Sequence, residues 1–393
     1  MPIVNRIAAM KDEITEWRQD MHANPELLYD VHRTAQLVAD KLRAFGCDEV
    51  TTGIGRTGVV GVIRGRGDAT GRVIGLRADM DALPIHETTG LPYASKVPGK
   101  MNACGHDGHT AMLLGAAKYL CETRNFHGTA IVIFQPAEEG GAGGKAMVDD
   151  GLMDRWRIDE VYGMHNMPGI PVGDFAMRPG PMLAATDEFT ITVRGVGGHA
   201  ARPHATVDPI LIGTALVQSL QSIVSRSVDP VDSAVVSVTR FHAGDAYNVI
   251  AETAEVAGTV RSLKPEIRDL VEARMREIVG GLAAAYGAGI DLHYDRNYPV
   301  TRNHPRQVEF AAAVAAEIVG DSRVDTDVPP LMGGEDFAYM LEKRPGAMVF
   351  LGNGNTPGLH NPAYDFNDEA IAFGCSYWVR LVERAMPATS AAG

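Results

Sequence analysis

The sequence predicts an α/β protein in which a domain with a mostly parallel sheet is interrupted by a smaller inserted domain. Two observations lead to this fold class. Short β-branched runs alternate with helical periodicity in both outer parts of the chain, and the middle part changes to half-exposed strands in the order β-α-β-β-α-β. The length of 393 residues also suits two or three domains. We expect residues 1–183 and 297–393 to form the larger domain and residues 184–296 to form the insertion.

The larger domain opens with a helical region at about 7–45, where apolar residues recur at helical spacing and Gly46 provides a stop. Buried strands are expected at 59–63, 73–76 and 130–134, where β-branched residues run together, and a helix is expected between the last two of these three. A strand, a helix and a strand at this spacing are typical of a crossover and a mostly parallel sheet. The expected strands are 59–63, 73–76, 130–134 and 347–351, and the later helices are 110–120, 308–319 and 368–385.

The inserted domain begins with a strand at 188–194, where apolar and polar residues alternate as in a half-exposed sheet. The elements that follow keep the order of a split βαβ unit, which is the pattern of a ferredoxin-like domain. They are a helix at 209–225, strands at 234–240 and 254–260, a helix at 265–286 and a strand at 290–294.

The composition excludes some classes of protein. The net charge of −13 argues against a nucleic acid or an anionic membrane as partner, because both require a basic face. The four cysteines form no CxxC pair, so a disulfide scaffold is not expected. No apolar run is long enough to cross a membrane or to resemble a signal peptide at the N-terminus. We therefore expect a cytoplasmic location.

The strongest chemical signal lies between a Gly- and Pro-rich loop and a helix. Cys104, His106, Asp107 and His109 fall within six residues, and a thiolate with imidazoles can present soft and borderline ligands to one metal. A capped helix start with incidental histidines is the alternative. The combination of residue types favours a metal site.

A second signal follows the strand at 130–134. Glu138 and Glu139 are neighbours, so their side chains point in different directions, and one can bind a metal while the other holds a water. A solvated acidic turn is the alternative. The buried strand before the pair and the glycines after it argue against that reading. Ligands at the carboxyl ends of parallel strands also match the usual crevice of α/β sheets.

Two further histidines follow apolar strand-like runs. His165 comes after 161–164, and His360 comes shortly after 349–351. Either one alone is more often a structural histidine. Together with Cys104, His106 and Glu139 they supply enough ligands for two metals with open positions.

These motifs give the chain a resemblance to the hippurate hydrolase and indoleacetyl-amino-acid amidohydrolase family, relatives of aminoacylases and zinc carboxypeptidases. The resemblance covers nearly the whole chain, and in combination its motifs are highly specific. The motifs lie at 21–27, 77–84, 102–109, 135–139, 197–204, 333–337 and 359–362.

The resemblance implies a role for each candidate. The implied metal ligands are Cys104, His106, Glu139, His165 and His360. Glu138 would be the general base, taking a proton from the water that bridges the metals and delivering it to the leaving amine.

Three residues of the insertion also receive implied roles. His199 would reach the active site of a partner subunit and stabilise the developing oxyanion, unless it is only a turn residue. Asn248 and Arg261 are candidates to hold the substrate carboxylate, for which the planar fork of arginine is well suited. A strand-end arginine on a solvated face is the competing interpretation.

The chain departs from the wider relatives at two positions. Arg77 stands where those relatives have a ligand histidine, two residues before Asp79, and Cys104 stands where they use an aspartate. Asp79 is therefore expected to orient a ligand or to cap a loop, and not to bind metal. Two divalent ions are expected, and zinc, manganese, cobalt and nickel all remain open.

The leading hypothesis is hydrolysis of N-acyl or N-aroyl amino acids by a homodimer or homotetramer whose inserted domain closes as a lid. A dipeptidase or carboxypeptidase with the same two-metal site is an alternative within the same chemistry. A binding protein that captures acyl-amino acids without turnover is another class, against which the intact Glu138 argues. A structural zinc protein fits poorly, because the candidate ligands come from distant strand ends and not from paired knuckles.

Overall fold

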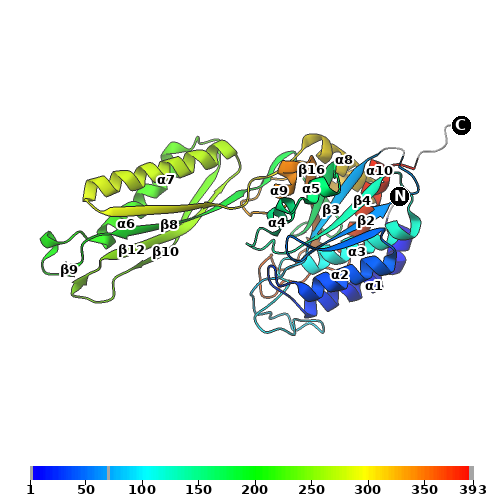
Figure 1. Cartoon of the computed structure of the whole chain (residues 1–393), viewed down its shortest axis with the longest axis horizontal. Helices are drawn as coiled ribbons and strands as arrows, with labels where there is room; N and C mark the ends of the chain where they lie inside the picture. The colour runs from blue at the N-terminus through cyan, green and yellow to red at the C-terminus, as the bar shows by residue number, and fades with distance from the viewer. Residues whose placement is uncertain (1–2, 69–70, 389–393) are drawn as a thin grey trace. The chain divides into compact units, whose positions relative to one another are not determined.

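The computed structural model describes residues 3–68 and 71–388, so residues 1 and 2 of the segment assessed for a signal peptide lie outside it. The chain divides into two compact units (Figure 1). Unit 1 comprises Met1–Met182, Arg302–Pro329 and Asp336–Gly393, and unit 2 comprises Leu183–Thr301 and Pro330–Glu335. The short return of the chain at Pro330–Glu335 was not expected from the sequence. The role of residues 184–296 as a lid and dimerisation domain stays a prediction.

Unit 1 is built on an eight-stranded sheet in the order β1-β2-β4-β3-β5-β16-β6-β15. Its central strands β4, β3, β5 and β16 run parallel to one another, whereas β1 and β2 are antiparallel additions at one edge. The strands are β1 (Glu49–Ile54), β2 (Gly58–Arg64), β3 (Val73–Asp79), β4 (Thr129–Gln135), β5 (Glu160–Pro168), β6 (Phe175–Ala176), β15 (Val324–Asp325) and β16 (Gly346–Gly354).

The largest helices of unit 1 share one hydrophobic core with this sheet, because all of them contribute buried apolar side chains to it. A second group of short helices includes α4 and α9, which pack on each other. The core helices are α1 (Asn5–Ala23), α2 (His32–Phe45), α3 (His106–Thr123), α8 (Pro305–Val319) and α10 (Ala370–Ala385), and the short ones are α4 (Gly143–Asp149), α5 (Leu152–Arg155) and α9 (Ala338–Lys343).

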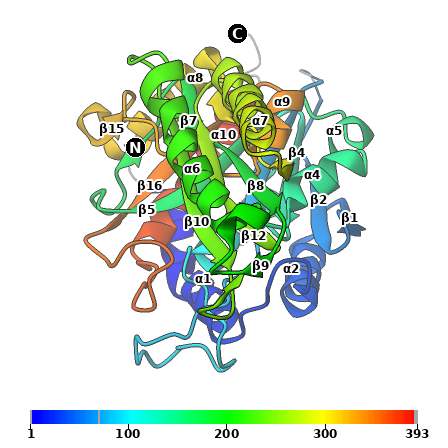
Figure 2. The ribbon, with the colours of Figure 1, turned by 90° about the vertical axis from the view of Figure 1, so that its left-hand side faces the viewer.

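Unit 2 has a four-stranded antiparallel sheet in the order β10-β12-β8-β13, with α6 and α7 side by side on one face (Figure 2). The first and third strands of the split βαβ unit are therefore neighbours, as in a ferredoxin-like domain. The elements are β8 (Ala185–Arg194), α6 (Pro209–Ser222), β10 (Ala234–Ala243), β12 (Thr253–Ser262), α7 (Pro265–Tyr286) and β13 (Gly289–Arg296).

The predicted fold class is confirmed. One helix boundary that matters for the candidate site differs from the prediction. Helix α3 begins at His106 and not near Thr110. Periodicity placed the start too late because the first turn is buried through polar side chains, which an apolar pattern does not register.

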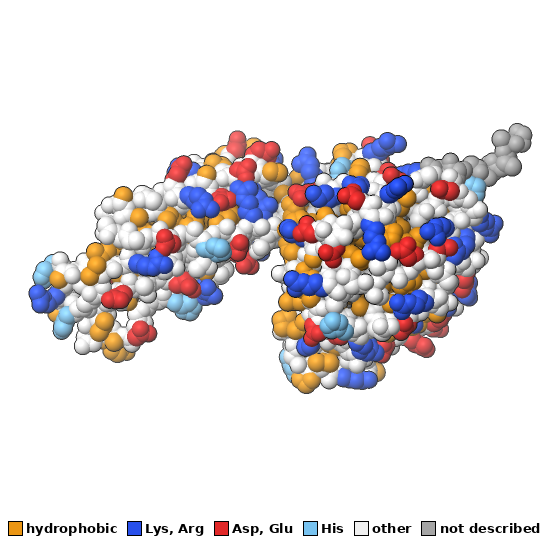
Figure 3. All heavy atoms as spheres, in the orientation of Figure 1, with side chains coloured by type: hydrophobic (Ala, Val, Ile, Leu, Met, Phe, Trp, Pro, Cys, Tyr) orange, Lys and Arg blue, Asp and Glu red, His pale blue; other side chains and the backbone are white. Residues whose placement is uncertain are grey.

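No helix in the described ranges is long and apolar enough to span a membrane. On the face drawn in Figure 3, acidic and basic side chains are interspersed over each unit, so that face gives no electrostatic indication of a ligand.

Candidate metal centre

The candidate site lies at the carboxyl ends of the central parallel strands of the unit 1 sheet. Because β4, β3, β5 and β16 are adjacent and parallel, the segments that follow them meet at the same edge. Glu138 follows β4, His165 lies near the end of β5, and His360 follows β16. The first turn of α3 adds His106 at this edge, with Cys104 just before it.

The structure brings the five predicted ligands together. Cys104 Sγ lies 3.4 Å from His165 Nε2, and His360 Nε2 lies 3.3 Å from Glu139 Oε1. His106 Nε2 is 3.9 Å from the same Glu139 oxygen. Ligand atoms lie within 4.8 Å of one another in three overlapping sets, which are Cys104/His106/His165, Cys104/Glu139/His360 and His106/Glu138/Glu139. The third set contains the predicted general base.

The side chains of this cluster fit a divalent cation. Among the described residues, neither ring nitrogen of His106 has a hydrogen-bond partner, and neither has Glu139 Oε1, although all three atoms are buried. Buried polar atoms without partners are costly, and a cation held by His106 Nε2 and Glu139 Oε1 would remove that cost for these two atoms. A thiol sulfur, imidazole nitrogens and a carboxylate are also the donor types that zinc and similar ions accept.

The electrostatics of the cluster point the same way. Burial by itself disfavours a charged His106, but the neighbouring carboxylates of Asp79, Asp81 and Glu139 raise its pKa to about 10. Burial, and then the charges of Glu139 and Glu138, raise the pKa of the Cys104 thiol. The carboxylates therefore favour positive charge at this place, and a divalent cation supplies it.

His109, the second histidine of the motif, is not positioned as a ligand. Its Nδ1 lies 2.6 Å from Asp79 Oδ1, and its Nε2 accepts the backbone N–H of Asn166 at 2.9 Å. Both ring nitrogens are thus used within the protein. The side chain of Asn166 also donates to the Cys104 carbonyl at 2.6 Å and accepts the Tyr364 hydroxyl at 2.7 Å, so it anchors the backbone of a candidate ligand.

Gly105, the residue before α3, allows the side chains of Asn166 and Tyr364 to approach the backbone closely. Gly105 has φ 88°, and a Cβ there would lie 2.2 Å from Asn166 Nδ2 and 2.5 Å from Tyr364 Oη. We expect Gly105→Ala to lower the free energy of unfolding by about 1–3 kcal/mol, through backbone strain and displacement of this pair. Denaturant unfolding measures this loss in the free energy of unfolding. Gly99→Ala is the matched control, because Gly99 has φ 75° and open space around its Cβ position. Equal losses in the two variants would contradict the packing role of Gly105.

Arg77 and Asp79 form a buried ion pair behind the cluster. Arg77 Nη1 donates to Asp79 Oδ2 at 2.8 Å, and its other nitrogens donate to Gln135 and Asp336. Asp79 Oδ2 is 3.7 Å from His106 Nε2. The guanidinium thus holds the carboxylate that faces two histidines, which suits the expected orienting role of Asp79.

Sequence reasoning did not single out three side chains that support the cluster. Asp81 accepts backbone N–H groups from the Glu138 turn, Asn166 anchors Cys104, and His22 Nδ1 lies 2.8 Å from Asp107 Oδ2. Asp81 and His22 both lie in motifs that carried the family resemblance, and this was the only available signal. The contacts themselves join residues far apart in the chain.

The candidates of unit 2 lie at different places. His199 is in β9 (Gly198–His199), which forms a separate two-stranded sheet with β11 (Val249–Ile250), and Asn248 O accepts the N–H of Ala200 at 3.0 Å. This small sheet therefore brings His199 and Asn248 together. Arg261 lies near the other end of β12, opposite Thr186, and at about 3.3 Å per residue it is about 26 Å from Thr253, at the end of β12 that follows β11.

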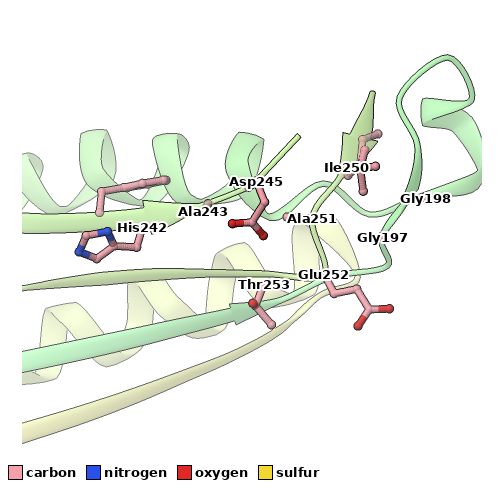
Figure 4. A pocket seen from close by; sticks show the side chains of 12 residues that line it. Gly197, Gly198, His242, Ala243, Asp245, Ile250, Ala251, Glu252 and Thr253 are labelled. Atoms are coloured by element: carbon pink, nitrogen blue, oxygen red, sulfur yellow. The ribbon is translucent and has the colours of Figure 1, made fainter. Parts of the chain in front are cut away.

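A pocket of about 860 Å³ lies beside the β9–β11 sheet and includes Gly197 and Gly198 in its lining (Figure 4). Asp245 and Glu252 also line it. Two carboxylates make this pocket unfavourable for a substrate carboxylate, so the pocket does not replace Arg261 as a candidate for that role.

Cation-binding side chains at the edge of an α/β sheet, with a carboxylate among them that can move protons, are the arrangement of a metal-dependent hydrolase. Residues 75–384 match the family model described as peptidase family M20/M25/M40, and the chain belongs to that family.

Individual relatives agree with this assignment. The chain is 45% identical to hippurate hydrolase of Campylobacter jejuni, and the match covers 97% of this chain and 98% of that protein. It is 42% identical to thermostable carboxypeptidase 2 of Saccharolobus solfataricus, and that match covers 89% of this chain and 88% of that protein. The crystal structure of the Bacillus subtilis YXEP protein, described as a dinuclear metal binding peptidase, has a TM-score of 0.83 at 36% identity and covers 97% of this chain and all of its own. The predicted family, fold class and enzymatic nature are confirmed.

Proposed function

We propose that the enzyme hydrolyses the amide bond of N-acyl or N-aroyl amino acids, releasing a carboxylate and a free amino acid. The observation that carries this proposal is the position of Glu138, whose carboxylate lies within 4.8 Å of ligand atoms of His106 and Glu139. The similarity to hippurate hydrolase supports an acyl-amino acid as substrate.

The proposed metal ligands are Cys104, His106, Glu139, His165 and His360. When bound, two divalent ions would polarise the scissile carbonyl and make the attacking water more acidic. Glu138 takes the proton of that water on a carboxylate oxygen and then delivers it to the leaving amine. Burial of Glu138 to 7% exposure keeps its carboxylate away from bulk water. Zinc, manganese, cobalt and nickel all suit these donors.

We further propose that each active site uses two copies of the chain. A small acyl-amino acid cannot contact both Arg261 and the β9–β11 sheet of one insertion, since about 26 Å separates them along β12. Arg261 with its planar fork would hold the substrate carboxylate, and His199 and Asn248 would come from the partner. His199 would then donate to the developing oxyanion, and the insertion would close as a lid. The proposed oligomer is a homodimer or homotetramer, and its proposed location is the cytoplasm.

Amine release from a panel of compounds tests the proposed reaction. The enzyme is treated with a chelator, divalent metal is added back, and benzoyl-glycine, acetyl-methionine, indoleacetyl conjugates and dipeptides are supplied in L and D forms. We expect metal-restored release from the acylated compounds. The similarity to thermostable carboxypeptidase 2 supports a peptidase as second candidate, and release from dipeptides alone would decide for it. No release with metal bound would favour a binding protein.

The proposed ligand set predicts the behaviour of Cys104→Ala. We expect this variant to retain less metal per chain after dialysis, because a thiolate ligand is lost. Elemental analysis measures the retained metal. Cys375→Ala is the matched control, since Cys375 is also buried but donates to the Met112 carbonyl away from the cluster. Full metal occupancy and unchanged activity in Cys104→Ala would remove Cys104 from the site.

A further inference from the structure

Asp81 occupies the turn after β3 and is 1% exposed, close to the candidate metal centre but outside its set of ligands. Its Oδ1 accepts the backbone N–H of Glu138 at 2.9 Å, and its Oδ2 accepts the backbone N–H of Glu139 at 3.1 Å. One carboxylate therefore binds two consecutive amides with both oxygens. Hydrogen bonds to an ionised acceptor are stronger than neutral ones, so this contact can fix the course of the chain at Glu138 and Glu139.

The turn that Asp81 binds has little regular structure to hold it. Glu138 and Glu139 lie between β4 and α4 and belong to no helix or strand. The residue before them, Ala137, has φ 54°, a conformation that residues with a Cβ seldom adopt without support from their surroundings. The carboxylate of Asp81 provides such support, because it holds the two amides that follow Ala137.

A third contact joins Asp81 to the candidate ligand His106. Asp81 Oδ1 is 3.6 Å from His106 Nδ1, whereas Nε2 of the same ring faces Glu139 Oε1 at 3.9 Å. A ligand histidine commonly binds metal through one nitrogen and donates its other N–H to a carboxylate, which fixes the orientation of the ring. Asp81 is placed to be that carboxylate and to leave Nε2 for the metal.

We infer that Asp81 is a positioning residue that sets the general base Glu138 and the ligands Glu139 and His106 in one geometry. The inference rests on the proposed function of these three residues. Asp81 belongs to none of the described groups of side chains whose ligand atoms lie within 4.8 Å of one another, and both of its oxygens accept amides of the Glu138 turn. It differs from Asp79, which is held by Arg77 and His109.

The chain offers a matched control for a substitution of Asp81. Glu26 also accepts two consecutive backbone N–H groups, from Arg33 at 3.0 Å and Thr34 at 2.8 Å, at the start of α2 and outside the candidate centre. Asp81→Asn and Glu26→Gln each replace one acceptor oxygen by an NH2 group that faces a backbone N–H. Both variants therefore lose one hydrogen bond of the same kind.

We expect Asp81→Asn to weaken metal binding by about 10–100-fold and to lower kcat more than it changes KM, since it disturbs the ligands and the base but not substrate contacts. Metal affinity is measured by competition with a chromogenic chelator, and thermal unfolding of the metal-free protein is measured in parallel. Glu26→Gln should lower the unfolding midpoint while metal affinity and kcat stay at wild-type values. Equal metal affinity in Asp81→Asn and wild type, or equal losses in both variants, would overturn the inference.

The wild-type protein gives an independent test that needs no variant. The amides of Glu138 and Glu139 should exchange slowly with deuterated water, although they lie outside helices and strands. Fast exchange would overturn the contact with Asp81. Metal affinity and exchange are both independent of turnover, so loss of metal binding in Asp81→Asn would support the positioning role even if the substrate panel showed no hydrolysis.

Discussion

Glu138→Gln is expected to lower kcat by about 10³-fold while the protein still binds metal, because the amide cannot take a proton from the attacking water. The substitution keeps the size of the side chain and alters neither the Glu138 backbone N–H that Asp81 accepts nor the five proposed ligands. Steady-state amine release gives kcat and KM, and elemental analysis gives metal per chain. The KM should change little, since the carboxylate acts on the water and not on the substrate.

Glu139→Gln provides the comparison. Glu139 faces His360 at 3.3 Å, and its Oε1 has no hydrogen-bond partner among the described residues, so this variant should lose metal first and activity as a consequence. If Glu138→Gln lost metal and Glu139→Gln kept it, the proposed roles of the two glutamates would have to be exchanged. Wild-type turnover in Glu138→Gln would exclude that residue as the base.

His199→Ala is expected to lower kcat by about 100-fold, because it removes a donor to the developing oxyanion. The decisive experiment mixes this variant with Glu138→Gln after dissociation and reassociation. If His199 acts in the partner's site, each mixed dimer contains one site with both native residues. Random reassociation then restores about a quarter of the wild-type activity.

Both parent variants, taken through the same dissociation alone, serve as controls. If His199 acts within its own chain, every site of a mixed dimer carries a defect, and the mixture stays inactive. Asn248→Ala mixed with Glu138→Gln should behave as His199→Ala does, because Asn248 and His199 lie together at the β9–β11 sheet. Recovery with one of these two variants and not with the other would contradict the assignment of both residues to the partner.

The sequence predicted the elements whose signals are local. A run of β-branched residues indicated β4, and a short apolar run indicated β16. The order of alternating and helical segments in the insertion matched the ferredoxin-like sheet. Cys104 and His106 were recognisable because unusual residue types lie close together in the chain. Glu138 and Glu139 were recognisable because they follow a buried strand, and parallel strands end at one edge.

The residues that support the cluster could not be predicted in this way. The carboxylate of Asp81 binds amides that belong to another strand's end, and no local pattern distinguishes Asp81 from Asp79 two positions earlier. For the same reason His109 could not be separated from His106, since only the fold shows that both nitrogens of His109 are used. Contacts of this kind depend on tertiary packing and not on periodicity.

The position of β16 in the unit 1 sheet has a consequence for synthesis on the ribosome. This strand pairs with β5 and β6 in the interior of the sheet, yet it is made after the whole of β8 to β13. While the ribosome makes the insertion, the apolar β5 therefore waits with one unpaired edge, which is a state open to aggregation. Unit 2 is almost continuous in sequence and can fold during this interval. The nascent chain is thus open to misassembly from the completion of β5 until the arrival of Gly346–Gly354.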